Sequence, residues 1–433
     1  MKNGKSKNSP QRSISKAPEI TQFVLVTPSY NLGKLLEQTI YSVAGQAGRF
    51  KIRYHVQDGG STDETLEILK KWKRLFASPS FPKFCDEITF SYSVGADSGM
   101  YDAINRGFSS ALKGLGPCIM SWINADDVFY PGALSAVASF FNHEPSAELC
   151  GGRIALTGED GFLSETYAPQ GKDRSEIAHG SYDGRNNGFI QQEGTFWRSE
   201  LWTQAGGLNP TLRLAGDFDL WRRFAQYAEY HTLDTITAIH RTRAGQLSSD
   251  MKRYYVEVDR IMATLQESDE KPPAEGTFFK YQLGQENWKR HTSPARTWRP
   301  IHGMGAFEGP YLELGITSGR WMVEKNAEVL VWSDAAGDSV LSLQFRNPRA
   351  LAKITLNGQS LKIDTAPIFM KLSLKLPFKA KRGWNPLKLQ IGSVIDEEGK
   401  RRKLGMFIDD ITLKKKKWSD QVLPALRKRW FWF

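Results

Sequence analysis

The chain has 433 residues, which is too long for one ordinary hydrophobic core and suits two domains with tails. Hydrophobic residues make up 40% and charged residues 24%, a balance that excludes a disordered chain. The net charge of +11 is carried by the two ends: residues 1–17 hold five Lys or Arg and no acid, and residues 414–433 hold seven and one Asp. Because nucleic-acid-binding proteins usually carry basic residues on a folded surface, this distribution argues against a nucleic-acid partner.

The cysteines and the hydropathy point to a compartment. Cys85, Cys118 and Cys150 follow no metal-ligand spacing and are too few for a disulfide scaffold, which fits a reducing cytoplasm. No apolar run reaches the roughly 18 residues that a membrane-spanning helix needs, and no hydrophobic stretch follows the basic N-terminus as in a secretory signal. We therefore expect a cytoplasmic protein that is soluble or peripheral on the inner face of the membrane.

Strands and helices alternate in the first part of the chain, after a basic tail of residues 1–20 that we expect to be disordered. The expected strands are residues 23–26, 54–56, 88–92 and 118–123, and the expected helices are residues 32–43, a segment from Thr62, and residues 101–112. This order predicts an α/β domain over residues 21–265, with a mostly parallel sheet and helices on both faces. In such sheets, ligands bind beyond the carboxyl ends of the strands.

The composition changes after residue 265. Residues 266–300 are rich in Pro, Gly and charged residues, and we expect a linker with a helical piece. Over residues 301–415, short β-rich runs alternate with turns such as Asn357-Gly358, which predicts an all-β sandwich or jelly roll. Residues 416–433 form a second tail, which mixes basic and aromatic side chains.

The loops after the first two expected strands carry polar and aromatic side chains. In Thr27-Pro28-Ser29-Tyr30-Asn31, Tyr30 can stack on a nucleobase and Thr27 can offer a hydrogen bond; the alternative is an ordinary turn with Ser29 or Asn31 as helix cap. Asp58, at the end of the second strand, can accept the imide N–H of uracil. The nearby Ser61-x-x-Glu64 spacing matches a capping box, so we assign Asp63 and Glu64 to capping.

Two further loops carry charge. In residues 97–107, Arg106 and helix-terminal N–H groups can face a diphosphate, although Arg106 fits a solvated helix face equally well. Asn124-Ala125-Asp126-Asp127 follows the fourth strand, and adjacent carboxylates repel each other unless a cation or base lies between them. Oxygen ligands of this kind suit Mg²⁺ or Mn²⁺, and the alternative is Asp127 as a cap before Pro131.

A later pair of segments carries a candidate base. Gln191-Gln192-Glu193 is followed closely by Trp197, and Asp217 begins a helix whose apolar positions include Phe218 and Trp221. A carboxylate at a loop–helix junction can point into a cleft and act as a general base. From the residues alone, Asp217 serves equally well as a helix cap.

Taken together, these motifs make residues 23–248 resemble the inverting glycosyltransferase family 2, which has the GT-A fold. The matching segments are Thr27 to Asn31 for P-x-Y-N, Asp58 to Thr65 for D-G-S-x-D-x-T, Asp97 to Gly107 for the D-x-G-x-Y-D-A-x-N-x-G stretch of a bacterial polysaccharide-synthesis branch, Asn124 to Asp126 for D-x-D, and Gly216 to Trp221 for E-D-x-D-L-W. Five motifs in the family's order make the resemblance specific.

The resemblance implies an enzyme that moves a sugar from a UDP- or GDP-sugar to a glycan or lipid-linked acceptor with inversion, in bacterial cell-surface polysaccharide synthesis. It implies donor binding by Thr27, Tyr30, Asp58, Arg106, Asn124, Asp126 and Arg243, a Mn²⁺ or Mg²⁺ ion on Asp126, Asp217 as the general base, and a candidate acceptor site at Gln192, Glu193 and Trp197. Two positions depart from the family: Asn124 replaces the first carboxylate of D-x-D, and Arg243 stands where relatives often carry His. Both changes remove a metal ligand, and Arg243 can instead neutralise the diphosphate itself.

The C-terminal region resembles the β-sandwich carbohydrate-binding modules appended to some bacterial glycosyltransferases, and the alternative is an interaction or scaffold domain. The basic and aromatic residues of the last segment favour contact with an anionic membrane, whereas packing on its own domain is the alternative. Two other functions remain open: a nucleotidyltransferase, and a non-catalytic protein that binds glycans or nucleotides. The first normally shows a Gly- and Lys/Arg-rich loop after the first strand, which residues 27–33 lack.

Overall fold

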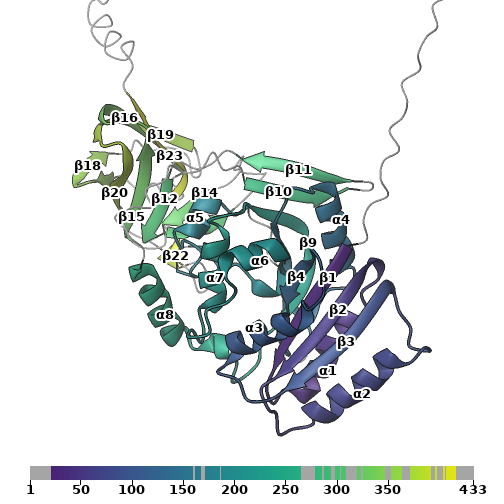
Figure 1. The fold of residues 1–433 in the computed structure, drawn as a ribbon. Coiled ribbons are helices and arrows are strands. Elements are labelled where there is room, and N and C mark those ends of the chain that lie inside the picture. Colours follow the sequence, from purple (N-terminus) through teal and green to yellow (C-terminus); the bar gives the residue numbers. More distant parts are fainter. Residues whose placement is uncertain are drawn as a thin grey trace, which may run out of the picture.

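The computed structural model places the chain in an α/β region and a following β region (Figure 1). Both terminal tails, residues 1–20 and 416–433, lie outside the described residues, so the predictions made for them stay predictions. The described residues are 21–158, 161–166, 171–185, 187–264, 278–284, 287–293, 298–302, 304–308, 319–322, 325–346, 353–362, 371–391, 395–396, 403–404 and 406–415.

The α/β region follows the alternation expected from the sequence. Its first elements are β1 (Thr21–Ser29), α1 (Gly33–Ala44), β2 (Gly48–Asp58), α2 (Thr65–Ala77), β3 (Cys85–Val94), α3 (Met100–Ala111), β4 (Ile119–Trp122), β5 (Val128–Phe129) and α4 (Ala133–His143). They are followed by β6 (Leu149–Thr157), β7 (Leu163–Thr166), α5 (Arg174–Ala178), η1 (Gln192–Gly194), β8 (Thr195–Arg198), α6 (Ser199–Ala205), α7 (Gly216–Phe224), β9 (Tyr230–Arg241), η2 (Leu247–Ser249) and α8 (Met251–Ala263). The predicted α/β sheet with helices on both faces is confirmed.

One large sheet organises this region, with the strand order β11-β10-β9-β6-β8-β4-β1-β2-β3. Strands β4, β1, β2 and β3 are parallel neighbours, and β6 and β9 run in the same direction, whereas β8 runs against β4 and β6. The short strand β5 pairs antiparallel with the end of β9.

Alternation along β1 explains why helices cover both faces. Phe23 and Leu25 belong to a core that also contains buried side chains of α1, α2 and α4, whereas Val24 and Val26 belong to a second core with α3, α6, α7 and α8. A strand buried on both faces reads as a continuous apolar run, which is why this segment was recognisable in the sequence.

The expected linker over residues 266–300 differs in the structure. Within it, β10 (Phe278–Leu283) and β11 (Trp288–Ser293) form a hairpin, and β10 pairs with β9 as a further strand of the large sheet. Tyr281 and Trp288 are buried against Phe140 of α4. Their burial in the first core supplies the stabilisation that the polar composition of this segment conceals.

The β region consists mainly of two antiparallel five-stranded sheets among the described residues. One has the order β12 (Trp298–His302), β15 (Asn326–Ser333), β20 (Gly383–Ile391), β17 (Lys353–Leu356) and β18 (Gln359–Lys362); the other has β13 (Met304–Glu308), β14 (Gly319–Met322), β23 (Phe407–Lys415), β16 (Gly337–Arg346) and β19 (Lys371–Ala380). The short strands β21 (Ile395–Asp396) and β22 (Lys403–Leu404) pair separately.

The two sheets share one core, to which alternate residues such as Val329 and Val331 of β15 and Leu341 and Leu343 of β16 contribute. This confirms the expected all-β sandwich. The predicted turn is also present: Asn357 and Gly358 have φ values of 45° and 84° between β17 and β18, as a tight hairpin requires.

The contact between α3 and β1 gives a first testable prediction. A Cβ added at Gly107 would lie 2.6 Å from Cγ1 of Val26, so Gly107→Ala should push the helix off the sheet and lower the free energy of unfolding by about 1–3 kcal/mol. Ser109→Ala, at an exposed position of the same helix, is the matched control. Urea denaturation tests this, and a Gly107→Ala protein at least as stable as wild type would show that helix propensity outweighs the clash.

Candidate active site

The topology brings distant loops to one edge of the large sheet. The parallel strands β1, β2, β4 and β9 end there at Ser29, Asp58, Trp122 and Arg241. Because β8 runs in the opposite direction, its beginning lies at the same edge, just after η1, which contains Glu193. The residues after four strands and before a fifth therefore converge, as expected for a ligand site of an α/β sheet.

The two residues predicted to bind the sugar donor near the end of β1 differ in exposure. Tyr30 is 62% exposed, and its ring lies 3.3 Å from where a Cβ on Gly59 would be. The hydroxyl of Thr27 is buried and lies 3.0 Å from the Tyr54 hydroxyl, so it already has a partner within the fold. The exposed ring of Tyr30 can therefore stack on a ligand, whereas Thr27 hydrogen-bonds to Tyr54 of the neighbouring strand.

Asp58 is buried and organises its own loop. Its Oδ2 accepts hydrogen bonds from the backbone N–H of Gly60 at 2.9 Å and of Ser61 at 2.8 Å, and its Oδ1 accepts one from the Ser61 hydroxyl at 2.5 Å. Each carboxylate oxygen has more than one lone pair, so these bonds do not use its full acceptor capacity. The observed role of the carboxylate is to hold its own loop together.

The predicted capping box at Ser61 and Glu64 is wrong. The Ser61 hydroxyl donates to Asp58 instead, and the side chain of Glu64 makes no capping hydrogen bond to α2. Instead, Asp63 accepts from the N–H and hydroxyl of Thr65 at 3.1 and 2.5 Å, and from the N–H of Gly33 at the start of α1 at 3.0 Å. The capping role assigned to Asp63 is correct, and one carboxylate serves the starts of two helices.

Arg106 is held within its own loop and helix. Its guanidinium bonds to the Asp102 carboxylate with an N–O distance of 2.7 Å, and its Nη1 donates to the Ala96 carbonyl at 2.9 Å. Asp102 also accepts from the Ser98 N–H at 2.8 Å. These contacts fix the loop that precedes α3, and because the half-exposed guanidinium has five N–H donors, they leave the predicted role of Arg106 on a diphosphate open.

The predicted metal ligand Asp126 is paired with the predicted diphosphate residue Arg243. The Nε of Arg243 donates to Oδ2 of Asp126 at 2.7 Å, and their side chains are only 21% and 7% exposed. Asp126 follows β4 and Arg243 follows β9, so the pair joins two loops that are 117 residues apart in sequence. A cation of the chain itself thus lies where the sequence predicted a metal ion.

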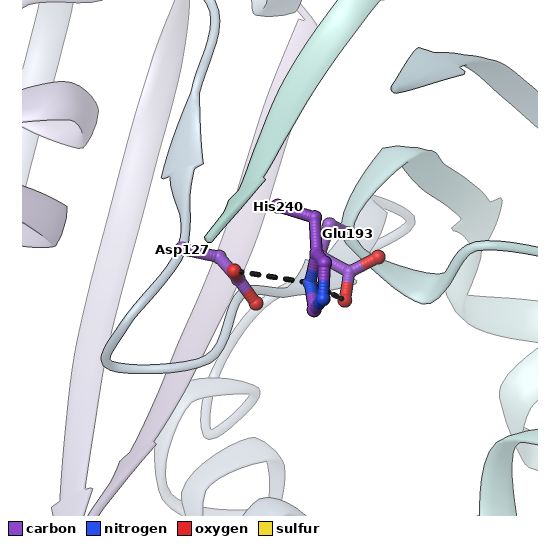
Figure 2. A group of neighbouring side chains, drawn as sticks. All are labelled: Asp127, Glu193 and His240. Atoms are coloured by element: carbon purple, nitrogen blue, oxygen red, sulfur yellow. Dashed lines mark ion pairs between the residues drawn. The ribbon is translucent and has the colours of Figure 1, made fainter. Parts of the chain in front are cut away.

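The neighbouring Asp127 forms a second buried cluster with Glu193 and His240 (Figure 2). His240 Nδ1 lies 3.3 Å from Asp127 Oδ1 and 3.4 Å from Glu193 Oε1. Burial alone would lower the pKa of His240, but the two carboxylates raise it well above its ordinary value. The ligand atoms of the three side chains lie within 4.8 Å of one another, so this group can bind a divalent cation.

Asn124 completes this loop. Its Nδ2 donates to Oδ2 of Asp127 at 3.2 Å, a hydrogen bond that an ionised Asp at the same position could not make. Asp127 also accepts from the backbone N–H of Arg241 at 2.9 Å. The departure from D-x-D thus has a local reason: an amide satisfies a buried carboxylate that a second acid would repel.

Asp217 lies in the first turn of α7, and its Oδ1 is 3.4 Å from the Tyr101 hydroxyl of α3. Burial raises the pKa of Asp217 to about 6; the backbone N–H of Phe218 opposes this rise, and the charge of Glu193 adds to it. Asp219 is occupied differently, because its Oδ2 accepts from Nε and Nη2 of Arg223 at 3.0 and 2.8 Å. The raised pKa of Asp217 suits a general base, whereas the carboxylate of Asp219 is engaged by Arg223.

One residue that the sequence did not reveal supports this helix. Glu257 of α8 accepts hydrogen bonds from the backbone N–H groups of Arg213, Leu214 and Ala215 at 2.9–3.1 Å, directly before α7 begins. Only the fold brings it there, since Glu257 follows these residues by more than 40 positions. Its carboxylate fixes the backbone that presents Asp217.

The three residues predicted to contact the acceptor lie in different places in the structure. Trp197 is fully buried and packs against Trp122, Trp202 and Trp221, so the prediction that it contacts an acceptor is not supported. Its burial follows from its place on β8, inside the second core. Gln192 and Glu193 are also buried, but they lie in η1 at the sheet edge that carries the other site residues.

Two broader findings bear on the sequence-based expectations. All three cysteines are unpaired, with Cys118 and Cys150 buried and Cys85 partly exposed. Among the described residues, no helix is both long enough and apolar enough to span a membrane.

Comparisons with known proteins found similar glycosyltransferases. Residues 24–200 match the model of the family described as glycosyl transferase family 2. A "PGL/p-HBAD biosynthesis glycosyltransferase" of Mycobacterium bovis is 35% identical over 127 residues, which are 29% of this chain and 43% of the relative, and one of Mycobacterium tuberculosis matches equally. The chain therefore spans less than half the length of these curated relatives.

Among solved structures, S. aureus TarS 1–349 in complex with UDP-GlcNAc is similar at 19% identity, with a TM-score of 0.42 over 57% of this chain and 69% of that one. The family match covers β1 through the start of α6, including the loops after β1, β2 and β4. The match to the family 2 model thus extends over about two fifths of the chain.

Proposed function

We propose that this protein transfers a sugar from a UDP- or GDP-sugar to a glycan or lipid-linked acceptor, with inversion at the anomeric carbon. The observation that carries the proposal is Asp217: a partly buried carboxylate with a raised pKa, near the charge of Glu193, which lies at the sheet edge where the loops of the matched segment converge. A nucleotidyltransferase or a non-catalytic binding protein has no evident use for a base in this place.

In the proposed reaction, the donor nucleotide lies on the loops after β1 and β2. Tyr30 stacks on the base and Asp58 accepts a base N–H, while the diphosphate extends toward the loop after β4. Asp217 takes the proton of an acceptor hydroxyl, whose oxygen attacks the anomeric carbon from the face opposite the diphosphate. The C–O bond to the phosphate breaks, and the nucleoside diphosphate leaves with the bonding electrons.

Product analysis tests the reaction class. Incubation of the protein with nucleotide sugars and candidate acceptors should release UDP or GDP together with a glycosylated acceptor. A nucleotidyltransferase would release pyrophosphate, and a binding protein would release nothing. Membership of a polysaccharide pathway, glycan binding by the β region and membrane contact by residues 416–433 belong to the same proposal and need separate tests.

Asp217→Asn should cut the transfer rate by about 10²–10⁴-fold, because it keeps size and polarity but removes the proton acceptor. In the wild-type protein, a base with a pKa of about 6 loses its active form as the pH falls through 6, so turnover should drop there rather than near pH 4, where an ordinary Asp titrates. Transfer rates measured between pH 4.5 and 8 test both statements.

The control for this change is Asp219→Asn, which breaks the ion pair with Arg223 instead. Nucleotide affinity should stay near the wild-type value in Asp217→Asn, since the base acts on the acceptor. Full activity in the Asp217→Asn protein would move the catalytic role to another carboxylate, with Glu193 next in line.

For the donor site, Asp58→Asn should weaken nucleotide binding by about 1.5–3 kcal/mol, the range of a hydrogen bond to a charged group. Ser61→Ala is the matched control, because it removes one donor to Asp58 and leaves the carboxylate in place. Calorimetry with UDP and GDP measures both. Equal losses in the two variants would mean that Asp58 acts only through its loop.

A third variant tests whether Glu257 positions Asp217. Glu257→Ala leaves the N–H groups of residues 213–215 without their acceptor and should lower the maximal rate by about 10–100-fold through misplacement of Asp217, with the donor KM unchanged. Glu257→Gln keeps one acceptor oxygen and should recover part of the rate. Lys252→Ala, on the exposed face of α8, is the control; a Glu257→Ala enzyme as active as this control would refute the positioning role.

A further inference from the structure

The two adjacent carboxylates after β4 each have a cation from the end of β9. Asp126 is paired with Arg243 at 2.7 Å, and Asp127 lies 3.3 Å from His240. Adjacent carboxylates in a largely buried loop need neighbouring positive charge. In this chain that requirement is met by side chains, which changes what the site can offer a diphosphate.

A divalent ion on Asp126, as the family resemblance implies, does not fit this arrangement. One carboxylate oxygen of Asp126 is taken by Arg243, and a guanidinium beside a metal ion would add repulsion. Asn124 offers at most a neutral oxygen and already donates its amide to Asp127. The cluster of Asp127, Glu193 and His240 has suitable ligand types, but Asp127 and Glu193 are 0% and 5% exposed, so an ion bound there would be enclosed by protein with little access to a diphosphate.

We propose that Arg243, held in place by Asp126, is the group that binds and neutralises the diphosphate of the donor and of the departing nucleotide, and that Asp126 positions it. This inference rests on the proposed function. It makes Arg243 the counterpart of the metal ion: a fixed positive charge at the point where charge develops as the sugar–phosphate bond breaks.

The contacts of Arg243 leave room for this role. Nε is used by Asp126 and Nη1 donates to the Ala244 carbonyl at 3.3 Å, while Nη2 makes no hydrogen bond within the described part of the chain. The side chain is 21% exposed, so it reaches solvent at the sheet edge. A planar guanidinium with donors to spare suits paired phosphate oxygens, and Asp126 reduces the side-chain entropy lost on binding.

Calorimetry with UDP, GDP, UMP and GMP, each in EDTA and in Mn²⁺, tests the proposal. Wild-type protein should bind a nucleoside diphosphate equally well in EDTA and in Mn²⁺. Arg243→Ala should weaken diphosphate binding by about 10–150-fold and monophosphate binding by less than about threefold, since the lost contact is to the second phosphate. Arg243→Lys keeps the charge without the planar fork and should fall between the two.

The matched control is Arg153→Ala, because Arg153 is a similarly half-buried arginine paired with Asp234, at 27% and 18% exposure. It should bind both kinds of nucleotide as wild type does. Loss of wild-type diphosphate binding in EDTA with recovery in Mn²⁺ would overturn the proposal, as would equal weakening of mono- and diphosphates by Arg243→Ala. An Arg243→Ala protein that binds diphosphates as the wild type does would also overturn the role of Arg243. If the wild-type protein binds none of the nucleotides, the proposed function itself fails.

Discussion

The pairing of β5 with the end of β9 is the constraint on which the site depends. Val128 lies opposite Ile239, so the residues just before β5 and just after Ile239 must face one another. Those residues are two adjacent acids on one side and His240 and Arg241 on the other. The acidic loop is therefore neutralised by the fold, through the Asp126–Arg243 ion pair, the His240 cluster and the backbone N–H of Arg241.

Other parts of the site follow from the same edge. Glu193 reaches His240 because β8 runs against its neighbours, so the short helix η1 before this strand lies where the parallel strands end. The charge of Glu193 in turn contributes to the raised pKa of Asp217. The negative charge of Glu193 thus acts both on His240 and on Asp217.

Sequence reasoning succeeded where structure is local. The apolar run at Phe23 to Val26 predicted a buried strand, and the acids after β2 and β4 were placed correctly because the ends of parallel strands meet. It failed where partners are remote: His240 and Glu257 gain their roles from residues more than 40 positions away. Trp197 was misplaced because an aromatic residue beside polar neighbours looks the same in a core and in a binding site, and only the packing of β8 decides between them.

The hairpin of β10 and β11 has a practical consequence for anyone dissecting this protein. A recombinant fragment cut after residue 265, the boundary that composition suggests, would remove the β10 partner from one edge of β9, from His231 to Leu233, and uncover Phe140. An open, partly apolar strand of this kind is a template for intermolecular pairing and aggregation. Insolubility of such a fragment would then reflect a missing strand rather than an inherently unstable fold, and extending it through Ser293 restores the natural border of the sheet.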